Sequence, residues 1–214
     1  SYLILFLILL FEFRKFIKIN FQYHIIKKII KYAMPLLPLT FLWFLISITD
    51  RIYISNFLNL AVLGLYSIAA KFVLGINFLI DIFHKSWWPI IMKSINDDFL
   101  VYNTLFNKVL RYYFCISILI LSVLNLTSET IFYIFTGKEY HNAFELFNIL
   151  ILQPFLFGLF YITSIGMWKD NKNILILYSV IIITSINFIL NYYLIPIFGA
   201  KGAAYSTVIS FLIL

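Results

Sequence analysis

The fold of this protein is decided by residues 34–93, which read MPLLPLTFLWFLISITDRIYISNFLNLAVLGLYSIAAKFVLGINFLIDIFHKSWWPIIMK. Two long apolar runs in this stretch are joined by a short, uncharged link at residues 56–64. Each run is about as long as the roughly 20 residues with which a helix crosses a lipid bilayer. The stretch therefore predicts a hairpin of two membrane-spanning helices.

The composition extends this prediction to the whole chain of 214 residues. Hydrophobic residues make up 63% of it and charged residues 12%, whereas soluble domains carry roughly 25% charged residues. The expected fold class is an all-α membrane protein, a multi-helix transmembrane bundle. The net charge of +7 does not point to nucleic acid, because the basic residues lie between apolar runs. The single cysteine, Cys115, excludes an internal disulfide framework.

Five full spans and two truncated ones are expected, forming a single bundle over residues 1–214. The apolar runs at both ends suggest a fragment of a longer protein, and the first of them lacks the basic flank of a signal peptide. Pro154 and Gly158 should kink or loosen the fourth span. The full spans are expected at about 35–54, 65–92, 109–126, 143–168 and 174–197, the truncated ones at 2–13 and 203–214, a polar link at 93–108 and the longest outer loop at 127–142.

Basic residues gather in alternate loops, and loops rich in Lys and Arg stay on the cytoplasmic side of a membrane. Residues 14–33 form a basic segment that we place in the cytoplasm. Its interleaved apolar residues favour an amphipathic helix in the membrane interface, with a plain basic loop as the alternative. The inner side then carries Arg14, Lys15, Lys18, Lys27, Lys28, Lys31, Lys93, Lys108, Arg111, Lys169 and Lys172, and the outer loops carry Lys138 and Lys201.

Ionisable residues also lie within or at the ends of the first two spans. Such side chains are costly at membrane depth, so they usually face a bundle interior or a water-filled cavity. On a helical wheel of the second span, the polar residues fall within one arc of about 140°, and the opposite face carries no charge. The first span holds Asp50 and Arg51, and the arc of the second holds Lys71, Asn77, Asp81, His84, Lys85 and Trp88.

Each of these charges has a structural interpretation beside a functional one. Asp50 and Lys71 are expected at similar depth, so they either pair across the hairpin or line a cavity. Asp81 and Lys85 have the spacing of a helical i, i+4 ion pair, and Lys85 alternatively snorkels to the interface. Arg51 either reaches the outer headgroups or leaves a positive charge in the cavity, where it would attract an anionic substrate.

The fifth span carries a second polar stripe, Thr184, Asn187 and Asn191. These side chains either hydrogen-bond to neighbouring helices or line the same cavity. No catalytic constellation or glycine-rich phosphate loop is found, so we expect no catalytic residue, no metal site and no cofactor. The histidines fall in three separate segments, as His24, His84 and His141.

Several motifs occur in order along the chain. The hairpin contains PLLP (35–38), TDRIYI (49–54), GLYSIAAK (64–71) and WP (88–89), and the later motifs are FTGKEY (135–140), NFILN (187–191), LIP (194–196) and GAKGAAYST (199–207). With these motifs the chain resembles the O-antigen and polysaccharide flippases of the multidrug/oligosaccharidyl-lipid/polysaccharide exporter superfamily.

The resemblance implies a transporter of two helical bundles with a central cavity that opens alternately to each side, and this chain would hold mainly the second bundle. Its function would be to flip undecaprenyl-diphosphate-linked oligosaccharide repeat units across the bacterial cytoplasmic (inner) membrane for surface polysaccharide synthesis. Partners would be the lipid-linked oligosaccharide, membrane lipids and other polysaccharide-assembly membrane proteins. The candidate cavity residues are Asp50, Arg51, Lys71, Asn77, Asp81, Lys85, Asn187 and Asn191.

Two alternatives remain at this point. A drug or cation exporter of the same superfamily would share the fold. A membrane polysaccharide polymerase or ligase would belong to a different class, because such enzymes use a large outer loop for their chemistry. The longest outer loop expected here, residues 127–142, is short, which favours a transporter.

Overall fold

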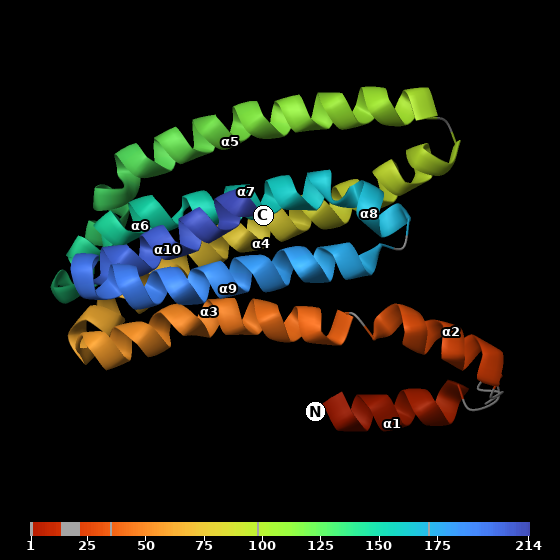
Figure 1. Ribbon diagram of the computed structural model, residues 1–214, viewed down its shortest axis with the longest axis horizontal. Helices are drawn as coiled ribbons and strands as arrows, with labels where there is room; N and C mark the ends of the chain where they lie inside the picture. Colours follow the sequence, from red (N-terminus) through yellow and green to blue (C-terminus); the bar gives the residue numbers. More distant parts are fainter. Residues whose placement is uncertain (1, 14–21, 35, 98, 171) are drawn as a thin grey trace. The chain divides into compact units, whose positions relative to one another are not determined.

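The computed structural model describes residues 2–13, 22–34, 36–97, 99–170 and 172–214 (Figure 1). The chain forms two compact units, Ser1–Met34 and Pro35–Leu214. Every regular element within the described residues is a helix, which confirms the all-α fold class. The single bundle predicted over residues 1–214 remains a prediction.

The first unit contains two helices, α1 (Tyr2–Phe13) and α2 (Tyr23–Ala33). Part of the basic segment predicted at 14–33 is therefore helical, and residues 14–21 lie outside the described residues. At about 100° per residue, Lys27 and Lys28 fall on one side of α2 and its isoleucines on the other. This arrangement favours the amphipathic helix over the plain loop, and its place at a membrane surface remains a prediction.

The second unit contains the spans. Its elements are α3 (Leu36–Phe57), α4 (Leu60–Asp97), α5 (Phe99–Phe135), the 3-10 helix η1 (Lys138–Ala143), α6 (Phe144–Leu150), α7 (Leu152–Thr163), α8 (Ile165–Lys169), α9 (Asn173–Phe198) and α10 (Ala200–Ile213). Five helical stretches of the described residues are long and apolar enough to cross a membrane, which confirms the five predicted spans. They are Leu37–Phe57, Leu60–Ile95, Leu100–Phe135, Lys138–Thr163 and Asn173–Phe198.

The helices are longer than the sequence predicted. Only Leu58 and Asn59 separate α3 from α4, and the expected loop at 127–142 is helical as far as Phe135. Polar residues do not end a helix when their side chains bond back to its own backbone. Thr127 Oγ1, for example, donates to the carbonyl of Val123 at 2.8 Å. The polar link expected at 93–108 is likewise mostly helical, within α4 and α5.

The fourth span is broken, as predicted. Ile151 separates α6 from α7, three residues before Pro154. Pro154 has no N–H to offer the carbonyl of Leu150, and its ring crowds that carbonyl, so the helix turns there. Gly158 serves a different purpose, because a Cβ at this position would lie 2.1 Å from the hydroxyl oxygen of Tyr113. Its small size lets α5 approach α7.

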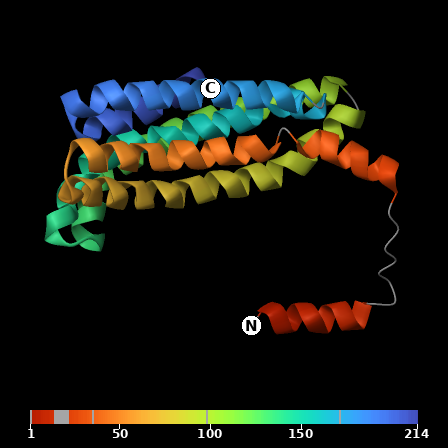
Figure 2. The ribbon, with the colours of Figure 1, turned by 60° about the horizontal axis from the view of Figure 1, so that its bottom comes forward.

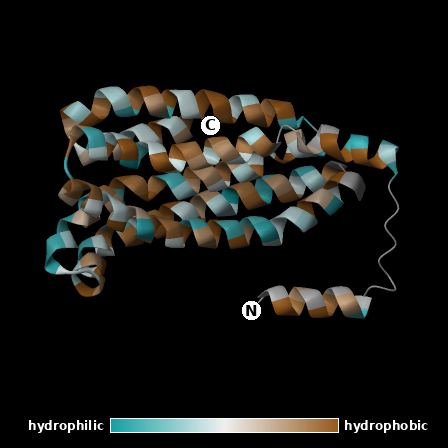
Figure 3. Ribbon diagram, turned by 90° about the horizontal axis from the view of Figure 1, so that it is seen from below, coloured by the Kyte–Doolittle hydropathy of each residue, from teal (hydrophilic) through white to brown (hydrophobic). Residues whose placement is uncertain are grey.

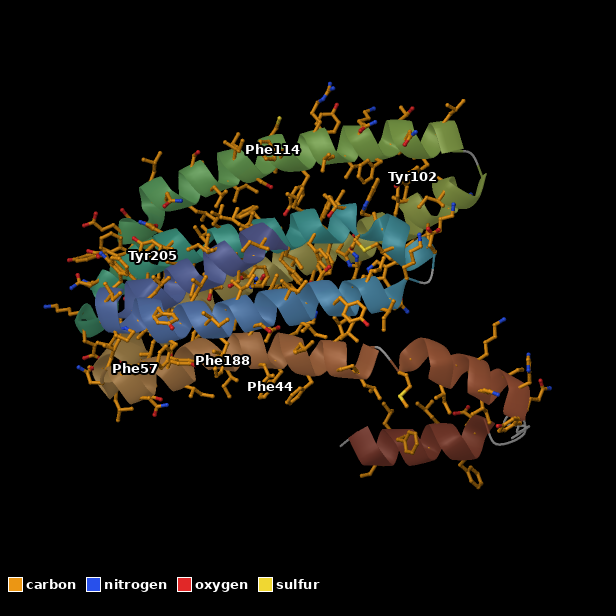
Figure 4. The ribbon with its side chains drawn as sticks, viewed as in Figure 1. Phe44, Phe57, Tyr102, Phe114, Phe188 and Tyr205 are labelled. Carbon is orange, nitrogen blue, oxygen red and sulfur yellow. The ribbon has the colours of Figure 1, made fainter. Side chains whose placement is uncertain are left out.

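The bundle positions α3 and α4 side by side (Figure 2), with α9 also packed against α3 and α10 packed against α9. Hydrophobic residues extend along the outside of these helices (Figure 3). Large aromatic side chains such as Phe44, Phe114 and Phe188 point outward (Figure 4) and are more than half exposed. An apolar exterior of this extent is what a lipid environment requires.

Candidate functional site

The centre of the candidate site is the carboxylate of Asp50, which is only 5% exposed. Asn191 Nδ2 donates to Oδ1 of Asp50 at 2.7 Å, and Thr207 Oγ1 donates to Oδ2 at 2.7 Å. The hydroxyl of Tyr66 donates to the same Oδ2. The four side chains come from α3, α9, α10 and α4, so one carboxylate joins four helices.

A second layer of hydrogen bonds supports Asn191. Its amide also donates to Asn187 Oδ1 at 3.1 Å, and its own Oδ1 accepts from Ser206 Oγ at 2.5 Å. Both hydrogens of the Asn191 amide are therefore used. Asn187 Nδ2 is buried and has no hydrogen-bond partner among the described residues. Of the polar stripe of the fifth span, Asn191 makes hydrogen bonds to other helices, the first of the two predicted interpretations. Asn187 bonds to Asn191 within α9, and Thr184 Oγ1 donates to the carbonyl of Val180 in the same helix.

The predicted ion pair between Asp50 and Lys71 is not formed within the described residues. Tyr66 occupies the face of α4 that is turned toward Asp50, and Lys71 lies about 140° around the helix from Tyr66. The side chain of Lys71 is exposed instead. Similar depth in the membrane was therefore a poor guide to pairing, because the direction in which each helix face points decides the contact.

A cavity of about 180 Å³ lies beside Asp50. It is partly open and is lined by residues of α3, α4, α10 and the broken fourth span. The cavity brings together Asp50, Arg51 and Asn77 from the predicted set, and Asn187 and Asn191 lie behind Asp50 in its hydrogen-bond network. Its lining residues are Trp43, Ile46, Ser47, Asp50, Arg51, Tyr66, Ala70, Val73, Leu74, Asn77, Leu150, Gln153, Thr207 and Phe211.

Three polar groups of the cavity wall keep unused hydrogen-bonding capacity. Asn77 Nδ2 donates to Gln153 Oε1 at 3.3 Å, and within the described residues this leaves the carbonyl oxygen of Asn77 and the NH2 group of Gln153 without a hydrogen bond. Arg51 is half-buried and makes no hydrogen bond or ion pair within the described residues. Asp50 differs, because both of its oxygens already accept from the protein.

Comparison with known proteins gives one result. The sequence profile of a family described as polysaccharide biosynthesis protein matches residues 1–145. The chain belongs to this polysaccharide biosynthesis family. No curated protein and no solved structure matches the chain. The matched range includes the helical hairpin and the 135–140 motif, whereas the motifs at 187–207 lie beyond it.

Membership of the polysaccharide biosynthesis family and five apolar spans make this a multi-pass membrane protein involved in polysaccharide synthesis or export. The cavity beside Asp50 lies among the described spans and has a mainly apolar lining, with the charged side chains of Asp50 and Arg51 in its wall. Among the described residues, no group of three or more His, Cys, Asp or Glu side chains comes together to hold a metal ion.

A second cluster of polar side chains surrounds Asp81, outside the cavity. The hydroxyl of Tyr161 donates to Asp81 Oδ1 at 3.4 Å, and its ring stacks on His84 with 4.0 Å between centroids. Within the described residues Asp81 forms no ion pair with Lys85, so the predicted i, i+4 pair is wrong. Lys85 is exposed, as snorkelling requires.

The structure adds residues that the sequence did not single out. Tyr66, Thr207 and Ser206 bond to Asp50 or Asn191, and the others are Trp43, Gln153 and Tyr161. Gln153 could have been found, because it is an uncharged polar residue inside an apolar span, and such residues usually face protein or water. Trp43 and Tyr161 gave no signal, since aromatic residues are common along these helices. Lys71, Asp81 and Lys85, in contrast, do not line the cavity.

Proposed function

We propose that this protein is part of a flippase that moves an undecaprenyl-diphosphate-linked oligosaccharide repeat unit across the bacterial cytoplasmic membrane. Its place in the polysaccharide biosynthesis family and its five apolar spans support a transporter that acts on a carbohydrate carried by lipid. The lipid tail stays in the bilayer, while the diphosphate and the sugars pass through a polar route inside the protein.

One observation carries the proposal: the guanidinium of Arg51 lies in the wall of the cavity and forms no ion pair within the described residues. A positive charge at membrane depth without a protein counter-ion is expensive, and an anionic ligand offsets that cost. A guanidinium also matches phosphate oxygens with paired hydrogen bonds. A diphosphate supplies both the negative charge and the geometry.

Lys71 on α4 adds a second positive charge to that of Arg51 on α3. Its side chain is exposed and makes no hydrogen bond or ion pair within the described residues. Since Asp50 is not its partner, the structural interpretation of Lys71 loses its support. We propose that Lys71 and Arg51 hold the diphosphate at successive points of the route, and that Asp50 organises the helices that present them.

The test is export of polysaccharide by variants of the complete protein. Arg51→Ala should reduce surface polysaccharide about tenfold or more at unchanged protein abundance, since hydrogen bonds to charged groups contribute roughly 1.5–3 kcal/mol. Lys71→Ala should have the same direction of effect. Lys108→Ala is the matched control, because Lys108 is exposed like Lys71 but lies on α5, outside the hairpin of α3 and α4 that carries Arg51 and Lys71.

The fate of the repeat unit separates the flippase from a polymerase. Loss of flipping leaves the lipid-linked repeat unit on the cytoplasmic side, where an added membrane-impermeant glycosidase cannot reach it. Loss of polymerisation leaves single repeat units accessible outside. Normal export by both Arg51→Ala and Lys71→Ala, or accumulation of single units outside, would contradict the proposal.

A further inference from the structure

Helix α5 is the span that the rest of the described chain covers least. The buried share of its most apolar stretch is 6%, whereas the other four spans have 22–50%. It packs against α4, α6, α7 and η1, and it lies at one edge of the second unit (Figure 1). The side of α5 that is turned away from these elements contacts either lipid or another protein surface.

This uncovered side of α5 carries a polar stripe. Six exposed residues follow one another at alternating spacings of four and three, and at 100° per residue they fall within an arc of about 80°. Alternating spacings of three and four are typical of a helix seam that packs against another helix. The stripe consists of Arg111, Cys115, Ile118, Ser122, Asn125 and Glu129.

The two ends of the stripe match the thickness of a membrane. Arg111 and Glu129 lie about 27 Å apart along the helix axis, close to the roughly 30 Å of the hydrocarbon core. Their charged groups therefore reach the two headgroup layers. Cys115, Ser122 and Asn125 lie between them, at the depth of the lipid tails.

Asn125 is the residue of the stripe that lipid suits least. Its Nδ2 donates to the carbonyl of Leu121 at 3.0 Å, which leaves Oδ1 and the second N–H without a hydrogen bond in the part of the chain that the structure describes. Polar side chains at this depth usually face protein, because an unsatisfied donor or acceptor is costly in hydrocarbon. The stripe therefore indicates a helix as the neighbour of α5.

The chemistry of the stripe suits a second copy of the same helix. An amide has both a donor and an acceptor, so Asn125 is complementary to its own counterpart. A two-fold axis brings each residue near it against the same residue of the other copy. Cys115 and Ser122 are small and let two helices approach closely. Equal charges meet only at Arg111 and Glu129, in headgroup layers where water and salt screen them.

We propose that this protein forms a dimer through α5. The two α5 helices run parallel and cross at a two-fold axis along the membrane normal, with Asn125 paired to its counterpart in the second copy. The interface is separate from the cavity beside Asp50, so the inference goes beyond the proposed function and does not depend on it.

The first test is disulfide cross-linking of the complete protein in membrane vesicles, with copper phenanthroline as the oxidant. Any further cysteine of the complete protein is first replaced by serine. A disulfide requires two Cα atoms within about 7 Å, so only residues close to the two-fold axis form one. Cys115 should yield a covalent dimer, and Ile118→Cys should do so in a Cys115→Ser background.

Ile116→Cys in the same background is the matched control. Ile116 and Ile118 are 55% and 51% exposed and lie at nearly the same depth, but they point about 160° apart around α5. Ile116→Cys should therefore remain monomeric under the conditions that cross-link Ile118→Cys.

The second test measures the strength of the dimer by energy transfer between labelled copies as they are diluted with lipid. Asn125→Leu should weaken dimerisation about tenfold, the value of hydrogen bonding between helices in a membrane. Thr127→Leu is the control, because Thr127 is also exposed but points about 160° away from Asn125. Thr127→Leu should dimerise like the unchanged protein.

Three results would overturn the proposal. One is the absence of a covalent dimer with Cys115 and with Ile118→Cys. Another is equal cross-linking of Ile116→Cys and Ile118→Cys, which would reflect random collisions. The third is unchanged dimerisation of Asn125→Leu, because the interface is centred on that amide. A melting temperature close to that of the unchanged protein shows that each variant is folded.

Discussion

The two carboxylates on the helical hairpin, Asp50 and Asp81, have opposite surroundings. Asp50 is 5% exposed and accepts hydrogen bonds from three neutral side chains on three other helices. Asp81 is half-buried and accepts one long bond of 3.4 Å from Tyr161. Neither forms an ion pair within the described residues. The two carboxylates of one hairpin therefore differ in how many helices their hydrogen bonds connect.

The difference teaches that convergence of helices, and not the presence of charge, decides the role of an acid in this bundle. Donors from α4, α9 and α10 meet at Asp50, so its carboxylate fixes the relative positions of four helices. At Asp81 the hydrogen bond from Tyr161 joins only α4 and α7. Removing Asp50 should consequently disturb the whole bundle, whereas removing Asp81 should have a local effect.

The largest expected effect is that of Asp50→Leu. Leucine has a similar size but leaves three buried donors without an acceptor, on Tyr66, Asn191 and Thr207. Since each of the three orphaned donors costs at least about 1 kcal/mol, we expect a stability loss of about 3 kcal/mol or more. Thermal unfolding of the complete protein in detergent measures it. Adding Tyr66→Phe removes one orphan and should recover part of the loss; simple additivity of the two losses would contradict the network.

A smaller effect is expected from Gly202→Ala. A Cβ at Gly202 would lie 2.2 Å from the carbonyl oxygen of Leu194, so α10 would have to move away from α9. That movement would draw Thr207 away from Asp50, at a cost of roughly 1–3 kcal/mol. Gly75→Ala is the matched control, because a Cβ there meets nothing within 4 Å and alanine favours a helix. Equal melting temperatures for the two variants would contradict the close approach of α9 and α10.

The smallest effect is expected from Asp81→Ala. This change removes a single, half-exposed hydrogen bond, so the stability loss should be about 0.5 kcal/mol or less. The same unfolding measurement in detergent checks it, with Tyr161→Phe as the variant that removes the bond from its other side. A loss as large as that of Asp50→Leu would mean that Asp81 is also a junction between helices, and the contrast between the two acids would fail.

Much of the fold could be predicted from the sequence, because the apolar runs and their lengths are local properties. The five spans and the break before Pro154 followed from such properties. The ends of the helices were predicted less well. Polar residues such as Thr127 were interpreted as loop, although their side chains bond to the helix backbone and let the helix continue.

The candidate site was predicted only in part. Asp50, Arg51 and Asn77 do line one cavity. Contact of a polar side chain with lipid is costly, so polar residues inside a span face the protein interior or a cavity. Their partners could not be found in the same way. Gln153 and Thr207 lie 76 and 157 residues along the chain from Asn77 and Asp50, and no helical wheel relates residues on different helices.

The sequence by itself determined that the chain is an all-α membrane protein, which segments span the bilayer, and which residues must avoid lipid. These are properties of hydrophobicity and backbone hydrogen bonding within one helix. The tertiary structure decided which of the polar residues meet. It placed Asp50 among donors of three other helices, left Lys71 exposed and opened a cavity at Arg51. The rotation and packing of each helix depend on residues elsewhere in the chain, such as Gly158 and Gly202, whose lack of a side chain lets two helices approach closely.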